Sequence, residues 1–509
     1  MICMNVGTLP YLFRSACRWK GDQTFVSDER EKLSGNGLWA KSCQFSAALL
    51  EHGIGRGDIV AFACASSTRH LVAFMACQLI GAIPCCLHLR ATATETSRGL
   101  EFLEPRAIIA DDNGLGLVQD PAKERGLTVI SLENAGWAGP EGNPDLESAA
   151  VTAADIDGDD SALLMLSSGT TGHPKAIRHS HRSLVASALA GPYVYGEIND
   201  GDRTAVIMPP SFAAWANTVL PFMAMRSQIY FSSWSSAEEF VTFVRQCRIS
   251  VIPLVPTLWR ALLALSPSPS DFPDLRSVFF SGEPGSDDLV QGMVEGICPN
   301  VRTAYLSSEI VCGAGIVANR TMLTRPGKGA CTGRPVPGAD VRIVNPEGSI
   351  DDVLGPNEVG EIIVSGPSLS LGYYKDEGLT KRAYTNGWLR SGDLGLIDED
   401  GFVHVAGRLD NTINSGGLKV QAEEVEAALL GHPVISQAAV VGVPDQRWGQ
   451  AVTAHVISLD PAIEQADLLD YLRHSGSLSP YKLPKTIHFH QTLPTGPTGK
   501  VLRRALRDT

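Results

Sequence analysis

One segment of the chain contains residue types that could hold a phosphate group. Residues 166–175 read LSSGTTGHPK, with four hydroxyl side chains, two glycines and one lysine at the end of an apolar run. Glycine lets the backbone turn sharply and approach a ligand closely. Backbone amides and hydroxyls in such a turn can surround phosphate oxygens, with Lys175 as a mobile positive charge. Taken alone, the segment also fits a surface turn rich in Ser, Thr and Gly, and it lacks the Gly-x-x-x-x-Gly-Lys-Ser/Thr pattern of nucleoside triphosphatases.

This segment resembles the phosphate loop of adenylate-forming enzymes, the family of acyl-CoA ligases, peptide-synthetase adenylation domains and luciferases. Other segments resemble motifs of that family and follow in the family's order: YLSSE at 305–309, SGD at 391–393, GRLDNTINSGGLKV at 407–420 and LPTGPTGKVLRR at 493–504. Because the matches are ordered and spread over most of the chain, they favour membership of the family over coincidence.

The resemblance implies a site for ATP, or for the acyl-adenylate formed from it, together with Mg²⁺. It assigns nucleotide binding to residues of several matched segments: Ser167, Ser168, Gly169, Thr171, Gly172, Lys175, Tyr305, Ser308, Asp393 and Arg408. Tyr305 would stack on the adenine ring, and Asp393 would accept hydrogen bonds from both ribose hydroxyls. Thr170 and Glu309 would hold Mg²⁺, a cation that prefers oxygen ligands.

The resemblance also implies a reaction in two steps. A carboxylate attacks the α-phosphate of ATP, and Lys500, with Thr170 and Glu309 as the other catalytic residues, offsets the negative charge that gathers there. The C-terminal domain then turns about a hinge at Asp410, and the thiol of CoA displaces AMP. Gly416 and Gly417 resemble the CoA-ligase branch of the family, in which this loop borders the pantetheine tunnel. Glycine removes side-chain bulk where a thin chain must pass.

The same resemblance places the acyl pocket around residues from three segments: Phe212, Ala213, Trp215, Ser281, Gly282 and Leu306. Peptide-synthetase domains that activate α-amino acids have an Asp at the position of Ala213, and burying an ammonium group without that carboxylate is costly. We therefore expect a substrate acid without an α-amino group. Leu306 stands where the family has glycine, and its side chain would crowd ATP, or close off or reshape the acyl pocket.

Four functions fit these motifs. The first is a complete acyl-CoA ligase that uses a small carboxylic acid, ATP and CoA. The second performs only one half-reaction, for example thioester formation from an acyl-adenylate supplied by a partner ligase, because Leu306 obstructs adenylation. The third loads an acyl-carrier protein. The fourth is a sensor that binds a nucleotide or acyl-adenylate without catalysis, although a mere binder has no need for Lys500.

Composition sets outer limits on function. The 509 residues are 44% hydrophobic and 19% charged, which indicates a globular chain of two or more domains. The net charge of −13 argues against a nucleic-acid partner, which needs a basic surface. Eleven scattered cysteines without a Cys-x-x-Cys pair favour reduced thiols in a cytoplasmic protein. Gln78, Gly81, Pro84 and His88 interrupt the longest apolar stretch, so we expect no membrane span.

The order of the predicted elements indicates an α/β fold. Helices and strands alternate from residue 36 to 253, with strand runs that are apolar throughout, as in a largely parallel sheet. From 333 to 408, short strands separated by Gly, Asp and Asn turns predict a small β-rich subdomain. The last segment predicts a compact α+β domain. We therefore expect a large N-terminal adenylate-forming domain at 1–409, built of α/β layers and the β-rich subdomain, and a small mobile C-terminal domain at 411–509.

Overall fold

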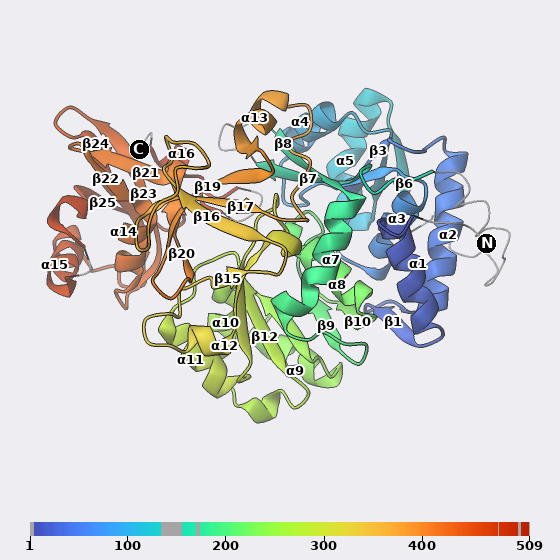
Figure 1. The fold of residues 1–509 in the computed structure, drawn as a ribbon, viewed down its shortest axis with the longest axis horizontal. Coiled ribbons are helices and arrows are strands. Elements are labelled where there is room, and N and C mark those ends of the chain that lie inside the picture. The colour runs from blue at the N-terminus through green and yellow to red at the C-terminus, as the bar shows by residue number, and fades with distance from the viewer. Residues whose placement is uncertain (1–4, 134–154, 169–173, 477, 497–499, 508–509) are drawn as a thin grey trace. The chain divides into compact units, whose positions relative to one another are not determined.

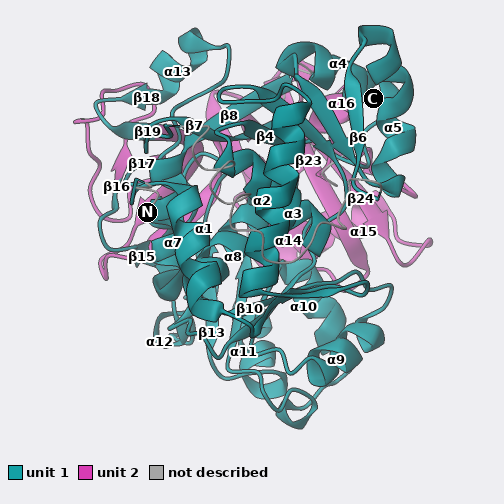
Figure 2. Cartoon of the chain, turned by 90° about the vertical axis from the view of Figure 1, so that its right-hand side faces the viewer, with its two compact units in different colours: residues 1–341, 364–389 teal, residues 342–363, 390–509 magenta. Residues whose placement is uncertain are grey.

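The computed structural model of the chain describes residues 5–133, 155–168, 174–476, 478–496 and 500–507 (Figure 1). The chain forms two compact units (Figure 2): unit 1 contains Met1–Val341 and Val364–Leu389, and unit 2 contains Arg342–Ile363 and Arg390–Thr509. The α/β class predicted from the sequence is confirmed. The domain boundary at Asp410 stays a prediction.

One sheet of unit 1 has six strands in the order β6-β5-β3-β4-β7-β8. They are β3 (Ile59–Ala63), β4 (Ile83–Cys86), β5 (Ala107–Ala110), β6 (Thr128–Ser131), β7 (Ser161–Ser168) and β8 (Pro174–Ser180). All neighbours pair in parallel except β7 and β8. Every residue of β3 is buried, which explains the unbroken apolar run IVAFA. The connecting helices are α3 (Thr68–Leu79), α4 (Ala93–Leu103) and α5 (Asp112–Arg125).

A second sheet of unit 1 has nine strands in the order β15-β14-β13-β12-β11-β9-β10-β1-β2. They are β1 (Thr24–Ser27), β2 (Lys32–Ser34), β9 (Arg203–Val206), β10 (Gln228–Phe231), β11 (Val251–Leu254), β12 (Ser277–Ser281), β13 (Val301–Tyr305), β14 (Ile316–Ala318) and β15 (Arg334–Pro335). The strands from β13 to β1 run parallel, so their carboxyl ends share one edge.

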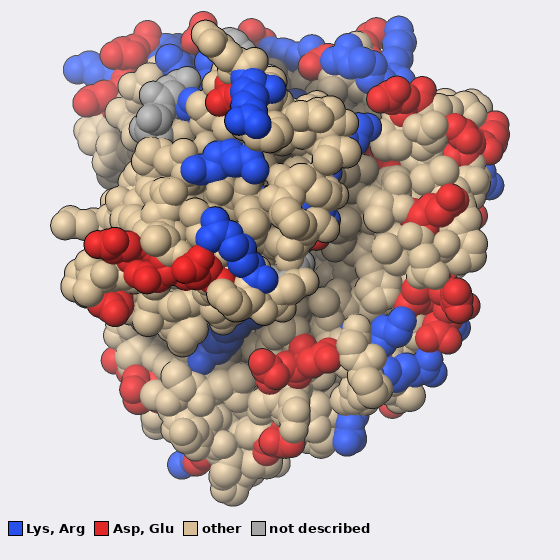
Figure 3. Space-filling model, turned by 90° about the vertical axis from the view of Figure 1, so that its left-hand side faces the viewer, with Lys and Arg blue, Asp and Glu red and all other residues tan. Residues whose placement is uncertain are grey.

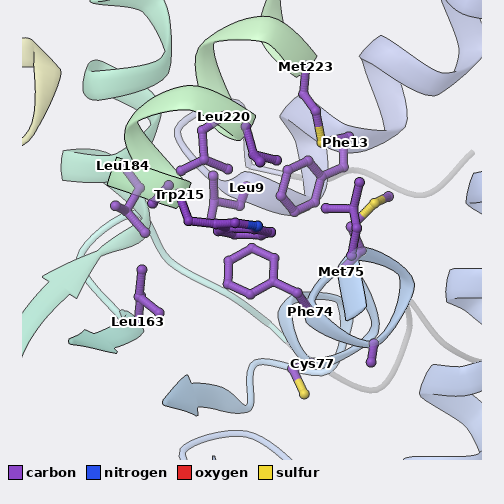
Figure 4. Close-up of a cluster of buried hydrophobic side chains, with 14 of the residues drawn as sticks. Leu9, Phe13, Phe74, Met75, Cys77, Leu163, Leu184, Trp215, Leu220 and Met223 are labelled. Atoms are coloured by element: carbon purple, nitrogen blue, oxygen red, sulfur yellow. The ribbon is translucent and has the colours of Figure 1, made fainter. Parts of the chain in front are cut away.

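Helices of unit 1 cover these two sheets. They are α1 (Leu9–Lys20), α2 (Gly35–Glu51), α7 (His181–Tyr195), α8 (Ala213–Ala224), α9 (Ala237–Gln246), α10 (Pro256–Leu263), α11 (Asp287–Gly296) and α12 (Arg320–Leu323), with short 3-10 turns η1 (Pro269–Asp271) and η2 (Cys312–Ala314). The largest core cluster joins strands of both sheets to α1, α2, α3, α7 and α8. Figure 4 shows its centre, where Trp215 lies against Phe74.

A smaller sheet contains β16 (Asp340–Val344), β17 (Gly360–Ser365), β18 (Tyr384–Thr385), β19 (Trp388–Ile397) and β20 (Val403–Arg408). It confirms the predicted β-rich segment, and α13 (Glu377–Ala383) precedes β18. The division between the two units passes within β17 and β19. A subdomain boundary of this kind leaves no composition shift in the sequence.

The rest of unit 2 is the predicted α+β segment. Its sheet contains β21 (Thr412–Ser415), β22 (Leu418–Gln421), β23 (Ile435–Asp445), β24 (Gly449–Ser458) and β25 (Thr486–Phe489). The helical elements are η3 (Leu409–Asn411), α14 (Ala422–Leu430), α15 (Gln465–Ser475), η4 (Pro480–Lys482) and α16 (Arg503–Arg507). Val425, Leu429, Leu468 and Leu472 of α14 and α15 pack on one face of this sheet.

The apolar stretch between residues 71 and 89 is not a spanning segment. It forms most of α3, a turn at Gly81 with φ of 70°, and β4. Across the described residues, no helix is both long and apolar enough to cross a membrane. On the face shown in Figure 3, acidic and basic side chains are interspersed among uncharged ones.

Candidate active site

The predicted phosphate loop connects two paired strands of unit 1. β7 and β8 are antiparallel, with Ser167 opposite Lys175 and Ser168 opposite Pro174. The other predicted loop residues lie outside the described residues: Gly169, Thr170, Thr171 and Gly172. Lys175 therefore stands on the strand that leaves the loop, and its Nζ lies 5.2 Å from the centre of the Tyr373 ring, within reach of a cation–π interaction.

Tyr373 connects Lys175 with the predicted Mg²⁺ ligand. Its hydroxyl donates a hydrogen bond to Oε1 of Glu309 at 3.1 Å. The segment that carries Tyr373 is bound along β8, because Tyr374 donates its backbone N–H to the carbonyl of Ala176 at 2.8 Å. One aromatic ring thus contacts a cation and a carboxylate that are far apart in the sequence.

His179 is a second link between β8 and the Glu309 segment. Its Nε2 donates to the carbonyl of Ser308 at 2.7 Å, and its Nδ1 lies 3.1 Å from Oγ of Ser183. Burial lowers the pKa of His179 to about 4, so the ring is neutral at neutral pH. A neutral imidazole has one donor, and the Nε2–H of His179 uses it here. Sequence reasoning identified neither His179 nor Tyr373, because no local pattern marks a partner more than 60 residues away.

The described carboxylates fit Mg²⁺ bound together with a nucleotide. Among the described residues, no group of three or more His, Cys, Asp or Glu side chains could hold a metal ion by itself. Mg²⁺ needs only one or two protein carboxylates when substrate phosphates and water supply the remaining oxygens. Glu309, whose Oε1 accepts a hydrogen bond from Tyr373, is the described carboxylate that the sequence predicts for this role.

Two predicted acyl-pocket segments meet at the carboxyl edge of the nine-stranded sheet. Ser281 ends β12 and Tyr305 ends β13, and these strands pair in parallel with Ser281 opposite Ala304. Gly282 follows with φ of 86°, a conformation that favours glycine. Ligands of α/β sheets bind outside the carboxyl ends of such strands.

Leu306 is accommodated by a glycine close by in the chain. Its Cδ2 lies 2.6 Å from where a Cβ on Gly315 would stand, and its side chain packs against the largest core cluster. Gly315 follows η2 and leaves the space that the Leu306 side chain occupies.

The Phe212 segment is anchored in the core. Phe212 precedes α8, and Trp215 in the first turn of that helix is 2% exposed. The Trp215 indole donates to Oγ of Ser66 at 2.9 Å and packs edge-on against His70 and Phe74. Phe212 and Trp215 both line a cavity, whereas Ala213 does not.

Asp393 and Arg408 form an ion pair in unit 2. They stand opposite each other on β19 and β20, and Nη1 of Arg408 lies 2.9 Å from Oδ1 of Asp393. Ser391 fixes the turn before Asp393, because its Oγ accepts the Asp393 backbone N–H at 3.0 Å. The carboxylate predicted to bind ribose is thus mostly buried and held by the guanidinium predicted to contact the nucleotide.

The remaining predicted residues of unit 2 lie outside its α-helices and strands. Asp410 lies in η3, between β20 and β21. Gly416 and Gly417 form the two-residue turn of the β21–β22 hairpin, with φ of 62° and 82°, as the usual hairpin turn requires. Lys500 is exposed, and its backbone carbonyl accepts a hydrogen bond from the Gly496 N–H at 2.9 Å.

Family models match most of the chain. Residues 12–374 match the AMP-binding enzyme model, and residues 424–500 match the model of the AMP-binding enzyme C-terminal domain. These two matches include the motif segments at 166–175 and 305–309 and the part of the last segment from 493 to 500, whereas the segments at 391–393 and 407–420 lie between them.

Similar proteins carry ligase names. A feruloyl-CoA synthase from Amycolatopsis sp is 30% identical, over 89% of this chain and 89% of its own. A probable CoA ligase, CCL5 from Humulus lupulus, is 29% identical over 92% of this chain and 86% of its own. The crystal structure of ATP-bound MatB from Rhodopseudomonas palustris has a TM-score of 0.83 and is 26% identical, with 98% of each chain covered. From these matches and the arrangement of its motifs, the chain belongs to the family of AMP-binding enzymes.

Proposed function

We propose that this chain is an AMP-forming acyl-CoA ligase that activates a carboxylic acid without an α-amino group. The observation that carries the proposal is the group formed by Lys175, Tyr373 and Glu309 beside the phosphate-loop strands. The ring of Tyr373 contacts Lys175, which would bind phosphate oxygens, and its hydroxyl contacts Glu309, which would bind Mg²⁺. Relatives named CoA ligase or CoA synthase, similar over about nine-tenths of the chain, support the same activity.

In the first step, a carboxylate oxygen of the acid attacks the α-phosphorus of ATP. The bond from that phosphorus to the bridging oxygen breaks, and pyrophosphate leaves. Lys175 stabilises the phosphates, and Lys500 offsets the charge that the attacking carboxylate brings to the α-phosphate. When bound, Mg²⁺ neutralises the phosphate oxygens, and Glu309 would hold it.

In the second step, the sulfur of CoA attacks the acyl carbon. The bond from that carbon to the AMP oxygen breaks, AMP leaves, and the thiol proton passes to solvent. We propose that Asp393 holds the ribose through both steps, that Asp410 is the hinge, and that Gly416 and Gly417 border the path of the pantetheine arm. The two glycines also have a local structural role as the hairpin turn, so their substitution would affect both.

The proposal also covers the thiol that accepts the acyl group and the cell compartment in which the protein works. The thiol of CoA and the phosphopantetheine thiol of an acyl-carrier protein react alike, and we propose CoA because the relatives named above are CoA ligases. No disulfide joins any of the ten cysteines among the described residues, and nine of these cysteines are buried. Because free thiols persist in reducing compartments, we propose that the protein works in the cytoplasm.

The experiment that tests this function separates the two steps. The protein is incubated with Mg·ATP and a panel of carboxylic acids, with CoA, with a phosphopantetheinyl carrier protein, or with neither, and mass spectrometry follows acyl-AMP and thioester. We expect acyl-AMP without an acceptor and acyl-CoA when CoA is added. A parallel incubation supplies synthetic acyl-adenylate and CoA in place of the acid and ATP. Thioester formed only in that incubation would contradict the complete ligase, and thioester formed only on the carrier protein would contradict CoA as the acceptor.

A further inference from the structure

Contacts on both sides of Lys500 hold its neighbours together within unit 2. Thr495 and Val501 form an antiparallel bridge, and the Leu502 N–H donates to the Pro494 carbonyl at 2.8 Å. Val501 also packs against a small apolar cluster of the same unit. Apolar contacts are non-directional, so they keep the chain on the unit without fixing its place along it. A directional anchor follows at the start of α16.

This anchor is an ion pair between α16 and α14. Nη2 of Arg503 donates hydrogen bonds to both carboxylate oxygens of Glu426, at 2.8 and 2.9 Å. Glu426 is held in turn, because its Oε1 accepts the backbone N–H of Val440 at 2.7 Å. The two side chains are only 28% and 12% exposed, so solvent and salt screen the pair less than they screen a surface pair. Arg503 therefore fixes where α16 begins against α14.

Glu423, also on α14, contacts the chain on both sides of Asp410. After Asp410, Nδ2 of Asn411 donates to Oε1 of Glu423 at 2.5 Å. Before Asp410, Gly407 leaves room for the carboxylate, because a Cβ on this glycine would stand 2.5 Å from Oε2 of Glu423. Oε1 of Glu423 also lies 3.8 Å from Nη2 of Arg503. One carboxylate thus connects the chain around the predicted hinge with Arg503.

We propose that Arg503 is a positioning residue for Lys500 and that Glu423 couples it to the hinge at Asp410. Arg503 fixes the start of α16, and Lys500 stands three residues earlier in the chain. A turn at Asp410 moves Lys500 by a defined amount only if the chain between them moves as one body, and the contacts of Glu423 and Arg503 supply that rigidity. This role rests on the proposed function, in which Lys500 serves the first step alone.

The two half-reactions should respond differently to a change at Arg503. Arg503→Gln removes the charge that holds the start of α16, so acyl-AMP formation should fall about 10- to 100-fold, as it does when a catalytic group is displaced. Thioester formation from supplied acyl-AMP and CoA should keep the wild-type rate. Arg503→Lys keeps the charge without the planar guanidinium and should recover part of the loss. Glu423→Gln leaves the bonds to Glu426 intact, so its effect should be nearer about three-fold.

The test measures both half-reactions in matched variants. Acyl-AMP is followed in Mg·ATP without CoA, with the acid that the wild-type protein activates best, and thioester is followed from the synthetic acyl-AMP of that acid and CoA. The matched control is Arg504→Gln, which removes an exposed cation from the same helix and should keep both wild-type rates. If Arg503→Gln does not fold, Arg503→Lys and Glu423→Gln are compared in the same way.

A second measurement needs no turnover. Endoproteinase Lys-C cuts after lysine, and mass spectrometry follows the release of the peptide 501–509 by cleavage at Lys500. Cleavage of a folded chain requires local opening, so Arg503→Gln should release this peptide about ten-fold faster than the wild-type protein. Arg504→Gln should release it at the wild-type rate.

The outcomes separate this inference from the proposed function. Equal losses in both half-reactions, or wild-type acyl-AMP formation by Arg503→Gln, overturn the positioning role. A wild-type protein that forms no acyl-AMP contradicts the proposed function instead. In that case, faster release of the peptide from Arg503→Gln still supports Arg503 as the anchor of Lys500, and equal release from both proteins overturns it.

Discussion

At the scale of single residues, the proposed chemistry depends on how negative charges are offset. A carboxylate and a triphosphate repel each other, so their reaction needs cations placed where the charge gathers. Lys175 is fixed on β8 against Tyr373, and Glu309 is bound by the same tyrosine. Lys500 belongs to unit 2 and is exposed. These positions allow the two lysines to be tested separately.

Replacing Lys500 should separate the half-reactions. We expect Lys500→Ala to lower acyl-AMP formation about 10²- to 10³-fold, because a positive charge is lost at the transition state. Thioester formation from supplied acyl-AMP and CoA should continue at the wild-type rate. The control is Arg504→Ala, which removes another exposed cation close by. Full acyl-AMP formation by Lys500→Ala would contradict the role of this residue.

Substitutions of Glu309 and Tyr373 should raise the Mg²⁺ concentration needed for acyl-AMP formation, and the Glu309 substitution should raise it more. Glu309→Gln keeps the shape of the side chain and removes its charge, so the Mg²⁺ concentration at half-maximal acyl-AMP formation should rise about 100-fold. Tyr373→Phe removes only the hydroxyl that orients the carboxylate at 3.1 Å, and an effect nearer 10-fold is expected for a residue that supports a metal ligand. An unchanged Mg²⁺ dependence in Glu309→Gln would show that this carboxylate is not a ligand.

At the scale of elements, the segment between β13 and η2 explains how the chain accommodates Leu306. A leucine at position 306 needs space that a glycine there would not need. Gly315 has no side chain and leaves that space free. The Leu306 side chain therefore packs against the core instead of hanging free in the site. This arrangement agrees with the complete ligase, which the similarity to CoA ligases favours over a single half-reaction.

A double-mutant cycle tests the pairing of Leu306 with Gly315. We expect Leu306→Gly to lower the free energy of unfolding by about 1–3 kcal/mol, because a partly buried side chain is lost, and to leave acyl-AMP formation no faster. Gly315→Ala should destabilise the wild-type protein, since its Cβ would stand 2.6 Å from Cδ2 of Leu306. The same change should cost less in Leu306→Gly. Additive effects in denaturant unfolding, or faster adenylation by Leu306→Gly, would refute this account.

Elements were more predictable from the sequence than contacts. Two elements of the alternation predicted from residue 36 onward are α2, Gly35–Glu51, and β5, Ala107–Ala110. Both have local signals, because a helical apolar stripe and a buried apolar run follow from their own residues. The contacts of Tyr373 with Glu309 and of His88 with Ser211 have none, since their partners are 64 and 123 residues away. The phosphate loop was found because glycines and hydroxyls cluster in the sequence itself.

At the scale of the whole molecule, buried neutral histidines make stability depend on pH. Burial lowers the pKa of His70 to about 3 and those of His179 and His181 to about 4, from an ordinary value of 6.5. Between pH 6.5 and 4, the unfolded chain therefore binds protons that the folded chain does not. Stability is highest above pH 6.5 and falls as the pH drops through this window.

Calorimetry over that pH range checks the sign and the source of the effect. We expect Tm to fall steadily from pH 7 to pH 4 and the slope to become shallower in His70→Phe, which keeps a ring among Phe62, Phe74 and Trp215 but removes the titrating group. His52→Phe, at the exposed end of α2, should keep the wild-type slope. A Tm that rises toward pH 4, or equal slopes in all three proteins, would contradict the prediction.

The central claim is that the acid is activated by attack on the α-phosphate, and an isotope experiment tests it most directly. An acid that the protein accepts as a substrate is labelled with oxygen-18 in both carboxylate oxygens. The protein is incubated with this acid, Mg·ATP and CoA, and mass spectrometry follows the products. Because the attacking carboxylate oxygen stays on phosphorus when the thiol takes the acyl group, the account predicts AMP that carries one oxygen-18 atom. Unlabelled AMP, or label in orthophosphate formed together with ADP, would contradict it.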